Sequence, residues 1–217
     1  MKVKLTLQEE ALGLLPAKED VHKEYIASRA PDAKTLEEEI VERGVDAVDE
    51  KGMTIFPRLA DGTPFYFDYQ MKGFFKDACQ MLARAGKNGY EGGKACAALK
   101  AYRKAIDGTL FVKPRRIPID TCGMMMDSCS RPLRAMTMQG ERVSLAKSET
   151  VPDGSTLEFE IICLDPNLEP MVRECLDYGI LRGLGQWRNS GKGTFTWEEL
   201  DADPAPKKRG RPKKVDA

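Results

Sequence analysis

The glycine-rich segment at 183–193 constrains the fold of this chain more than any other feature. It follows an apolar-periodic stretch at 168–182, typical of a helix, and precedes the alternating residues 194–197, typical of a strand. Glycine adopts positive φ and lets another backbone approach closely, which favours a tight connection here. A dinucleotide-binding fingerprint runs from strand through glycines to helix, and a Walker loop opens a helix. The order in this chain is reversed, so neither motif fits and nucleotide hydrolysis is not predicted.

The same segment combines its glycines with cations and one large ring. Its candidate nucleic-acid-binding residues are Arg182, Gly183, Gly185, Trp187, Arg188, Gly191, Lys192 and Gly193. Bare backbone amides and cations suit phosphate oxygens, and an aromatic face suits a base. The alternative is a structural connection from helix to strand with Trp187 in the core. The sequence leaves both interpretations open.

Apolar periodicity predicts strand and helix early in the chain. Residues 3–7 alternate as in a half-buried strand, and residues 68–82 follow the i, i+3, i+4, i+7 spacing of an amphipathic helix. A glycine-rich break at 86–93 separates this helix from a second one at 95–106. These segments supply the first strand and first helix of the predicted fold.

The later segments predict strand, strand, helix and strand. Residues 120–141 are predicted as a long loop or an irregular hairpin, followed by two β-rich runs at 142–151 and 156–164. The Pro-Asp-Gly-Ser sequence between these runs favours a hairpin. A helix at 168–181 and a strand at 194–197 complete the order. This order predicts an α+β, ferredoxin-like (RRM-like) core with helical and loop insertions.

The charge distribution divides the chain into parts. Lys plus Arg and Asp plus Glu each number 34, so the formal net charge is zero. Residues 204–217 nevertheless carry a charge of +5, and residues 1–51 carry −5. We expect one α+β domain over 1–200, with an acidic helical insertion at 17–50, and a disordered basic tail over 201–217.

Composition excludes several classes of protein. Hydrophobic residues make up 41% of the 217 residues, enough for a buried core, so a wholly disordered chain is excluded. No apolar run of about 18 residues occurs and the N-terminus lacks a signal-peptide core, so we expect a cytoplasmic protein with no membrane partner. The six cysteines show no C-x2-C spacing, and His22 is the single histidine. This argues against a zinc site, and we expect no metal and no cofactor.

Three segments, in the expected order, resemble the RAMP superfamily, the RNA-binding proteins of CRISPR effector complexes. The helix, glycine-rich loop and strand at 168–197 resemble its C-terminal signature. Residues 68–78, Asp-Tyr-Gln-Met-Lys-Gly-Phe-Phe-Lys-Asp-Ala, resemble the Lys-Gly opening of its first helix. Residues 149–161, Glu-Thr-Val-Pro-Asp-Gly-Ser-Thr-Leu-Glu-Phe-Glu-Ile, resemble its segment of proline, small residue, glycine and strand. The similarity covers about half of the chain and is greatest to the backbone subunits that polymerise along guide RNA.

The resemblance implies a ferredoxin-like fold that binds RNA. Lys72 and Gly73 match the position where a cation and a backbone meet RNA phosphate, and 183–193 matches the loop beside the RNA path. The usual Pro-Gly-Ser-Ser is replaced by residues 68–71, and no residue matches the aspartate with which some backbone subunits cut target RNA. The compact size resembles stand-alone members encoded by phages and prophages, which implies the cytoplasm of a bacterial or phage-infected cell.

The basic tail provides a second nucleic-acid motif. Its residues are Lys207, Lys208, Arg209, Gly210, Arg211, Pro212, Lys213 and Lys214. The Arg-Gly-Arg-Pro core resembles an AT-hook, which places an extended Arg-Gly-Arg in a narrow minor groove whose negative potential attracts arginine. The tail therefore predicts added affinity for duplex DNA. The alternative is a generic polybasic or solubilising tail.

A third group of cations is spread along the middle of the chain. Its members are Lys113, Arg115, Arg116, Arg131, Arg134 and Arg142. If the segments at 113–116 and 130–142 fold beside the sheet, they extend a basic groove. The alternative is a set of unrelated surface charges.

Three functional hypotheses follow. The first is a non-catalytic protein that binds RNA or single-stranded nucleic acid, with head-to-tail self-association in which the acidic 17–50 stretch meets the basic 113–142 region. The second is a phage-encoded mimic or inhibitor of a CRISPR subunit, which acts by contact with CRISPR effector subunits. The third is an RNA-processing endoribonuclease with His22 as general acid or base. The Glu-rich surroundings of His22 favour a surface residue, so we do not expect an enzyme.

Overall fold

The computed structural model describes residues 1–16, 53–137 and 140–200 of the 217-residue chain. The acidic 17–50 insertion, His22 and the tail at 201–217 lie outside the described residues. Within the described ranges, none of the helices combines the length and the apolar character needed to cross a bilayer.

The main sheet has the strand order predicted for a ferredoxin-like unit. Its strands are β1 (Lys2–Leu7), β5 (Phe65–Phe67), β6 (Leu110–Lys113), β7 (Arg116–Asp120), β10 (Thr156–Cys163) and β11 (Phe195–Glu199). The spatial order is β11-β1-β10-β7-β5, with β6 also paired to β10, and all pairs are antiparallel. With β6 and β7 taken as one bent strand, this is the βαββαβ arrangement. The predicted α+β fold is confirmed.

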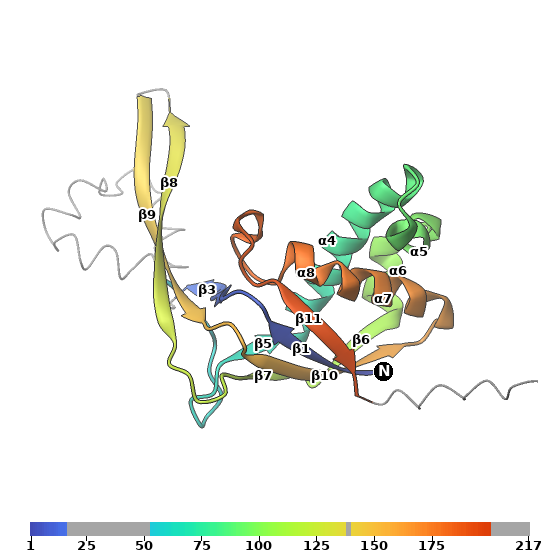
Figure 1. Ribbon diagram of the computed structural model, residues 1–217, viewed down its shortest axis with the longest axis horizontal. Coiled ribbons are helices and arrows are strands. Elements are labelled where there is room, and N and C mark those ends of the chain that lie inside the picture. Colours follow the sequence, from blue (N-terminus) through green and yellow to red (C-terminus); the bar gives the residue numbers. More distant parts are fainter. Residues whose placement is uncertain (17–52, 138–139, 201–217) are drawn as a thin grey trace, which may run out of the picture.

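Helices cover one face of this sheet (Figure 1). They are α4 (Asp68–Lys87), α5 (Lys94–Ala98), α6 (Tyr102–Thr109), α7 (Glu169–Asp177) and α8 (Gly179–Arg182), with the 3₁₀ turns η1 (Glu91–Gly93), η2 (Pro166–Leu168) and η3 (Arg188–Ser190). The alternation of β1 directs Val3, Leu5 and Leu7 towards the helices, where they join Phe74 and Phe75 of α4 in one buried cluster. The open face of the sheet carries polar side chains such as Glu158 and Glu160 together with apolar ones such as Phe111 and Ile162.

The helical predictions need two corrections. The helix predicted at 95–106 is two helices, because Ala101 has a φ of 50° and breaks the regular backbone between α5 and α6. The single helix predicted at 168–181 is divided into α7 and α8, and Ile180 on α8 is exposed. Within the glycine-rich break at 86–93, Gly86 and Gly93 allow close packing, because a Cβ on Gly86 would lie 2.1 Å from the carbonyl oxygen of Gly93.

A second sheet carries a long hairpin that stands away from the main sheet (Figure 1). Its strands are β2 (Ala11–Leu12), β3 (Leu15–Pro16), β4 (Thr54–Ile55), β8 (Asp127–Thr137) and β9 (Gly140–Val151). The order is β2-β9-β4-β3, and β8 pairs with β9 from Asp127↔Thr150 to Thr137↔Gly140.

This hairpin settles one expectation and overturns another. Of the two alternatives for residues 120–141, the long loop is wrong and the hairpin is closer, because residues 127–137, half of that stretch, form β8. The runs at 142–151 and 156–164 do not pair with each other: β9 pairs with β8, and β10 pairs with β1, β6 and β7. The turn between them instead crosses from one sheet to the other and binds the end of β1, since Gly154 N donates to Leu7 O at 2.8 Å and Leu7 N donates to Ser155 O at 2.9 Å.

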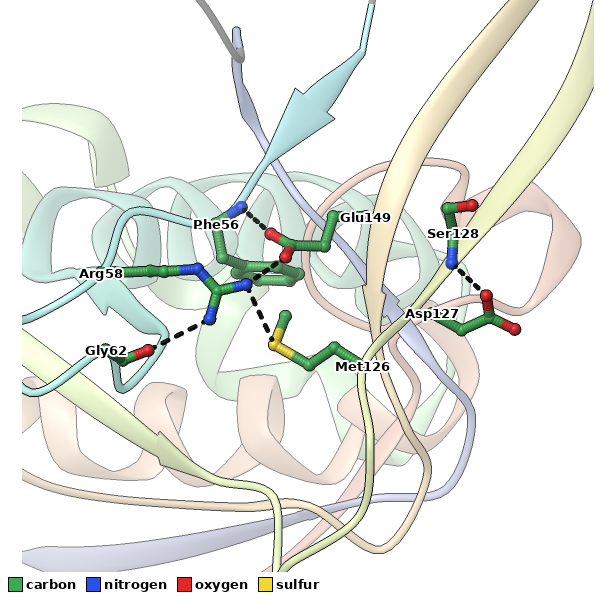
Figure 2. Close-up of polar contacts among 7 residues, drawn as sticks. All are labelled: Phe56, Arg58, Gly62, Met126, Asp127, Ser128 and Glu149. Atoms are coloured by element: carbon green, nitrogen blue, oxygen red, sulfur yellow. Dashed lines mark hydrogen bonds and ion pairs between the residues drawn. The ribbon is translucent and has the colours of Figure 1, made fainter. Parts of the chain in front are cut away.

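An ion pair fixes the base of the hairpin (Figure 2). Glu149 of β9 accepts a hydrogen bond from Phe56 N at 2.9 Å and pairs with the guanidinium of Arg58. The same guanidinium donates to Gly62 O at 3.1 Å and contacts Met126 Sδ at 3.6 Å. The Glu149 side chain is only 13% exposed, so removal of Arg58 would leave a poorly solvated charge. The pair ties the second sheet to the turn that precedes β5.

Candidate nucleic-acid interface

The glycine-rich loop at 183–193 is a closed structure whose two ends touch. Leu184 N donates to Gly193 O at 2.7 Å, and Gly193 N donates to Glu10 O at 2.9 Å. A Cβ on Gly193 would lie 2.1 Å from Leu184 O, and Gly193 has a φ of 71°. A Cβ on Gly191, which has a φ of 80°, would meet nothing within 4 Å. Gly193 is therefore required by packing, and Gly191 only by its backbone conformation.

Each cation of the loop lies against a carboxylate of the same chain. Arg182 Nε and Arg188 Nη1 both donate to Oδ2 of Asp77 on α4, at 3.0 and 2.8 Å. Lys192 Nζ lies 2.8 Å from Glu10 Oε1, and the hydrogen bond to Glu10 raises the pKa of Lys192 above its usual value. The sequence suggested cations turned towards phosphate. The structure instead shows cations that hold the loop to α4 and to the β1–β2 connection.

Trp187 lies at the surface and not in the core. It has a φ of 53°, its side chain is 39% exposed, and the Arg131 guanidinium lies 5.2 Å from its ring centroid. Arg131 Nη2 also donates to Gln186 Oε1 at 2.9 Å, and Gln186 Nε2 donates to Gly13 O at 2.7 Å. The loop is thus fixed to the second sheet by Gln186, and one face of an aromatic ring remains accessible.

A second group of cations lies where β6 passes into β7. Lys113, Arg115 and Arg116, here called the β6–β7 strip, are all exposed. Within the part of the chain that the structure describes, no carboxylate pairs with any of them. The guanidinium of Arg116 lies over an aromatic face, 5.7 Å from the Phe65 ring centroid. The strip therefore presents three cations to solvent.

Aromatic rings flank the strip, and the sequence interpretation missed them. Tyr69 is 53% exposed and stacks on Phe67 at a centroid distance of 5.1 Å. Phe111 is 40% exposed, and Lys72 Nζ lies 4.4 Å from its ring centroid. The signal for Phe111 was present in the alternation of β6, where Leu110 and Val112 face the core and the intervening ring must face outwards. Lys72 therefore joins this surface, while Gly73 lies one residue further along α4.

A hollow with a volume of about 930 Å³ opens between the strip and the open face of the sheet. Its wall includes Lys113 and Arg115 on one side and Glu158 and Glu160 of β10 on the other. Lys4 lies 3.8 Å from Glu158 on this face. Because carboxylates repel phosphate, the β10 side of this hollow is a poorer path for a nucleic-acid backbone than the β6–β7 strip, although Lys113 lies opposite Glu160 in the register of β6 with β10.

The six cations spread along the sequence are divided between segments of two different sheets. Lys113, Arg115 and Arg116 belong to the main sheet, and Arg131 belongs to β8 of the second sheet, where it contacts the glycine-rich loop. Arg134 and Arg142 lie towards the tip of the hairpin, where Arg134 is paired with Val143 and Arg142 with Ala135. Their side chains lie outside the part of the chain that the structure describes. The tail candidates from Lys207 to Lys214 and the catalytic candidate His22 are likewise outside the described residues.

The described residues contain no candidate metal site. Among residues 1–16, 53–137 and 140–200, no group of three or more His, Cys, Asp or Glu side chains is placed to hold a metal ion. All six cysteines are free. Cys79, Cys96 and Cys175 lie together in the core, and their mutual contacts with burial raise the pKa of Cys79 and Cys96, which keeps these thiols protonated.

Comparison with known proteins supports the fold and nothing finer. No family model matches the chain, and no curated protein matches it. Among solved structures, a chain in the cryo-EM structure of the Type III-B Cmr-beta bound to cognate target RNA is similar, with a TM-score of 0.50 and 13% sequence identity. The alignment covers 91% of this chain and 58% of that chain, so this protein spans well under two thirds of its neighbour. The similarity shows the fold alone.

Proposed function

We propose that this protein binds RNA or single-stranded nucleic acid without cutting it, and that the strand follows the β6–β7 strip towards the glycine-rich loop. One observation carries the proposal: three exposed cations with no carboxylate partner in the described residues lie beside the exposed rings of Tyr69 and Phe111. Such cations release counterions from a phosphate backbone, and such rings stack on bases of any sequence. The similarity to a chain of an assembly bound to target RNA supports the same proposal.

The basic tail would add affinity for duplex DNA. Its Arg209-Gly-Arg-Pro212 core, which is AT-hook-like, carries no structural support beyond its sequence. Six cations at 207–214 would bind any nucleic acid in a salt-dependent manner. In this proposal the domain binds single strands, and the tail binds duplexes, in the cytoplasm of a bacterial or phage-infected cell.

A second candidate function is contact with CRISPR effector subunits by a phage-type mimic, and head-to-tail self-association belongs to the same class. It is favoured by adjacent apolar side chains on α8, where Ile180 is 53% exposed and Leu181 is 69% exposed. Exposed apolar side chains that form a continuous patch are typical of protein–protein contact surfaces. Light scattering of the purified chain, alone and with a Type III effector complex, tests this alternative. A strictly monomeric protein that leaves the complex unchanged would contradict it.

The primary proposal is tested by fluorescence anisotropy with labelled oligouridine, the corresponding DNA strand and a DNA duplex over a salt series. We expect binding of the single strands, an affinity that falls as salt rises, and intact strands on a denaturing gel afterwards. Absence of binding at low salt would contradict the proposal. Cleavage of the strand without added metal, lost in His22→Ala, would instead support the endoribonuclease hypothesis.

A further inference from the structure

A small pocket lies between α4, β5 and the glycine-rich loop, apart from the β6–β7 strip. Its volume is about 250 Å³, below the about 300–1,000 Å³ typical of pockets for drug-sized ligands. Apolar side chains, including Met71, Phe74 and Leu184, form much of its wall. The size and the apolar wall suit one flat ring system and exclude a larger ligand.

One polar group in this wall has no partner. The hydroxyl of Tyr66, whose side chain is 1% exposed, makes no hydrogen bond to any described residue. Burial raises the pKa of Tyr66, so the group stays protonated and can donate. Buried polar groups in native proteins nearly always have a partner, so a water or a ligand group that reached this buried hydroxyl would complete its hydrogen bonding.

A second polar group lies at the same pocket with free donors. Gln70 uses its Oε1 to accept a hydrogen bond from Phe67 N at 2.8 Å. No described residue accepts a hydrogen bond from its Nε2. The pocket therefore offers a hydroxyl and an amide NH₂ group, which can hydrogen-bond the edge of a heterocycle.

Two glycines leave the space that a ligand needs. A Cβ on Gly185 would lie 3.2 Å from the Tyr66 hydroxyl, so any side chain there would crowd that group. A Cβ on Gly73 would meet nothing within 4 Å, and Gly73 is exposed where it lines the pocket. The guanidinium of Arg188, held by Asp77, lies at the same pocket. The pocket is thus open at Gly73 and has a cation beside it.

We propose that this pocket takes a single nucleobase, turned out of the bound strand, with its polar edge on Tyr66 and Gln70 and its faces against the apolar wall. The proposal rests on the proposed function, because the base belongs to the strand that the β6–β7 strip would hold. Pockets for bases turned out of a strand combine these features, namely apolar or aromatic walls with hydrogen bonds to the base edge. The glycine-rich loop would then contribute the shape of the site, and the strip would contribute its charge.

The test compares labelled oligouridine with an abasic ribose-phosphate strand of the same length, for three variants. Gly73→Leu fills the mouth of the pocket at a position where a Cβ meets nothing. Tyr66→Phe removes the unpartnered hydroxyl alone. Gly108→Leu is the matched control, because Gly108 on α6 is also exposed with nothing near its Cβ and does not line the pocket.

We expect the ratio of the affinities for the base-bearing and the abasic strand to fall about tenfold in Gly73→Leu and about fivefold in Tyr66→Phe. Gly108→Leu should keep the wild-type preference, and Tyr66→Phe and Gly108→Leu should keep the affinity for the abasic strand. The melting temperature of Tyr66→Phe should not fall, since the hydroxyl has no partner to lose. If Gly73→Leu and Gly108→Leu show the same preference, the pocket holds no base, although the proposed function stands. If wild-type protein binds neither strand, the proposed function fails, and the pocket assignment fails with it.

Discussion

The glycine-rich loop, taken together with Arg182 at the end of α8, and the β6–β7 strip each carry three cations but place them in opposite surroundings. The loop directs its two arginines to Asp77 and its lysine to Glu10, with those guanidinium side chains 24% and 28% exposed. The strip has no carboxylate partner in the described residues and is exposed throughout. For a cation, the absence of an internal counterion is therefore a better indication of phosphate binding than a position close to glycines in the sequence.

The physical reason lies in what a phosphate must displace. A cation already paired with a carboxylate gains little from a phosphate, because one charged hydrogen bond replaces another. An unpaired cation keeps its full charge available and contributes a whole released counterion to the binding equilibrium. On this account the strip supplies the electrostatic part of strand binding, and the loop supplies a rigid wall with one exposed ring.

The largest expected effect comes from the basic tail, which belongs to neither the loop nor the strip. Truncation after Asp203 deletes the six tail cations, so the salt slope for a single strand should flatten by about 4 and that for a duplex by about 5. Truncation after Lys214 removes three residues and no cation, and is the matched control. Equal slopes in both truncations would show that the tail does not touch nucleic acid.

The second largest expected effect is on stability, because substitutions in the loop and in the strip should change the free energy of unfolding by different amounts. Gly193→Ala should lower the free energy of unfolding by about 3 kcal/mol or more, because the new Cβ would lie 2.1 Å from Leu184 O at a positive φ. Gly191→Ala, with positive φ and free space, should cost about 1–2 kcal/mol. Arg115→Ala in the strip should change the value by less than about 0.5 kcal/mol. Urea titrations measure all three, and a Gly193→Ala variant as stable as wild type would overturn the packing argument.

The exposed ring of the loop gives a smaller effect on binding. Trp187→Ala should weaken single-strand affinity by about tenfold, as expected for one lost stacking contact. Its cost in stability should stay well below the about 3–5 kcal/mol of a buried tryptophan, since the ring is 39% exposed. A variant that unfolds easily yet binds normally once folded would assign Trp187 a purely structural role.

The smallest effect concerns the internal ion pairs of the loop. Arg182→Gln combined with Arg188→Gln should lower stability by about 1 kcal/mol, because Asp77 loses both charged donors at a partly exposed site. Asp77→Asn should cause a similar loss from the opposite side while it frees both arginines. We therefore expect Asp77→Asn, and not the arginine double variant, to bind the strand more tightly in anisotropy titrations. The reverse ranking would mean that the arginines already contact phosphate.

Much of the fold was predictable because local periodicity determined it. The stripe from Met71 to Leu82 is buried along α4, and the alternation of Val3 to Leu7 is buried along β1, as their spacing required. The pairing of the long hairpin was not predictable. Residues 127–132, Asp-Ser-Cys-Ser-Arg-Pro, lack the β-branched and aromatic residues of a typical strand, and their partner in β9 is chosen by tertiary contacts such as the Arg58–Glu149 pair.

The candidate site was predictable in composition but not in arrangement. The sequence showed which cations and glycines exist, yet Asp77 lies over 100 positions from the two arginines that it binds, and no local pattern links them. The exposed side of Phe111 could have been read from the alternation of β6. The pocket beside Tyr66 could not, because its walls come from α4, β5 and the loop and meet only in the folded chain.

The central claim is that the strip, and not the loop, supplies the charge for strand binding. It is tested most directly by the salt dependence of oligouridine affinity in two triple variants that remove equal charge. One is Lys113→Gln with Arg115→Gln and Arg116→Gln, and the other is Arg182→Gln with Arg188→Gln and Lys192→Gln. We predict that the strip variant flattens the slope of log K against log salt by about 2, while the loop variant leaves it unchanged. A flattened slope in the loop variant with an unchanged slope in the strip variant would contradict the account.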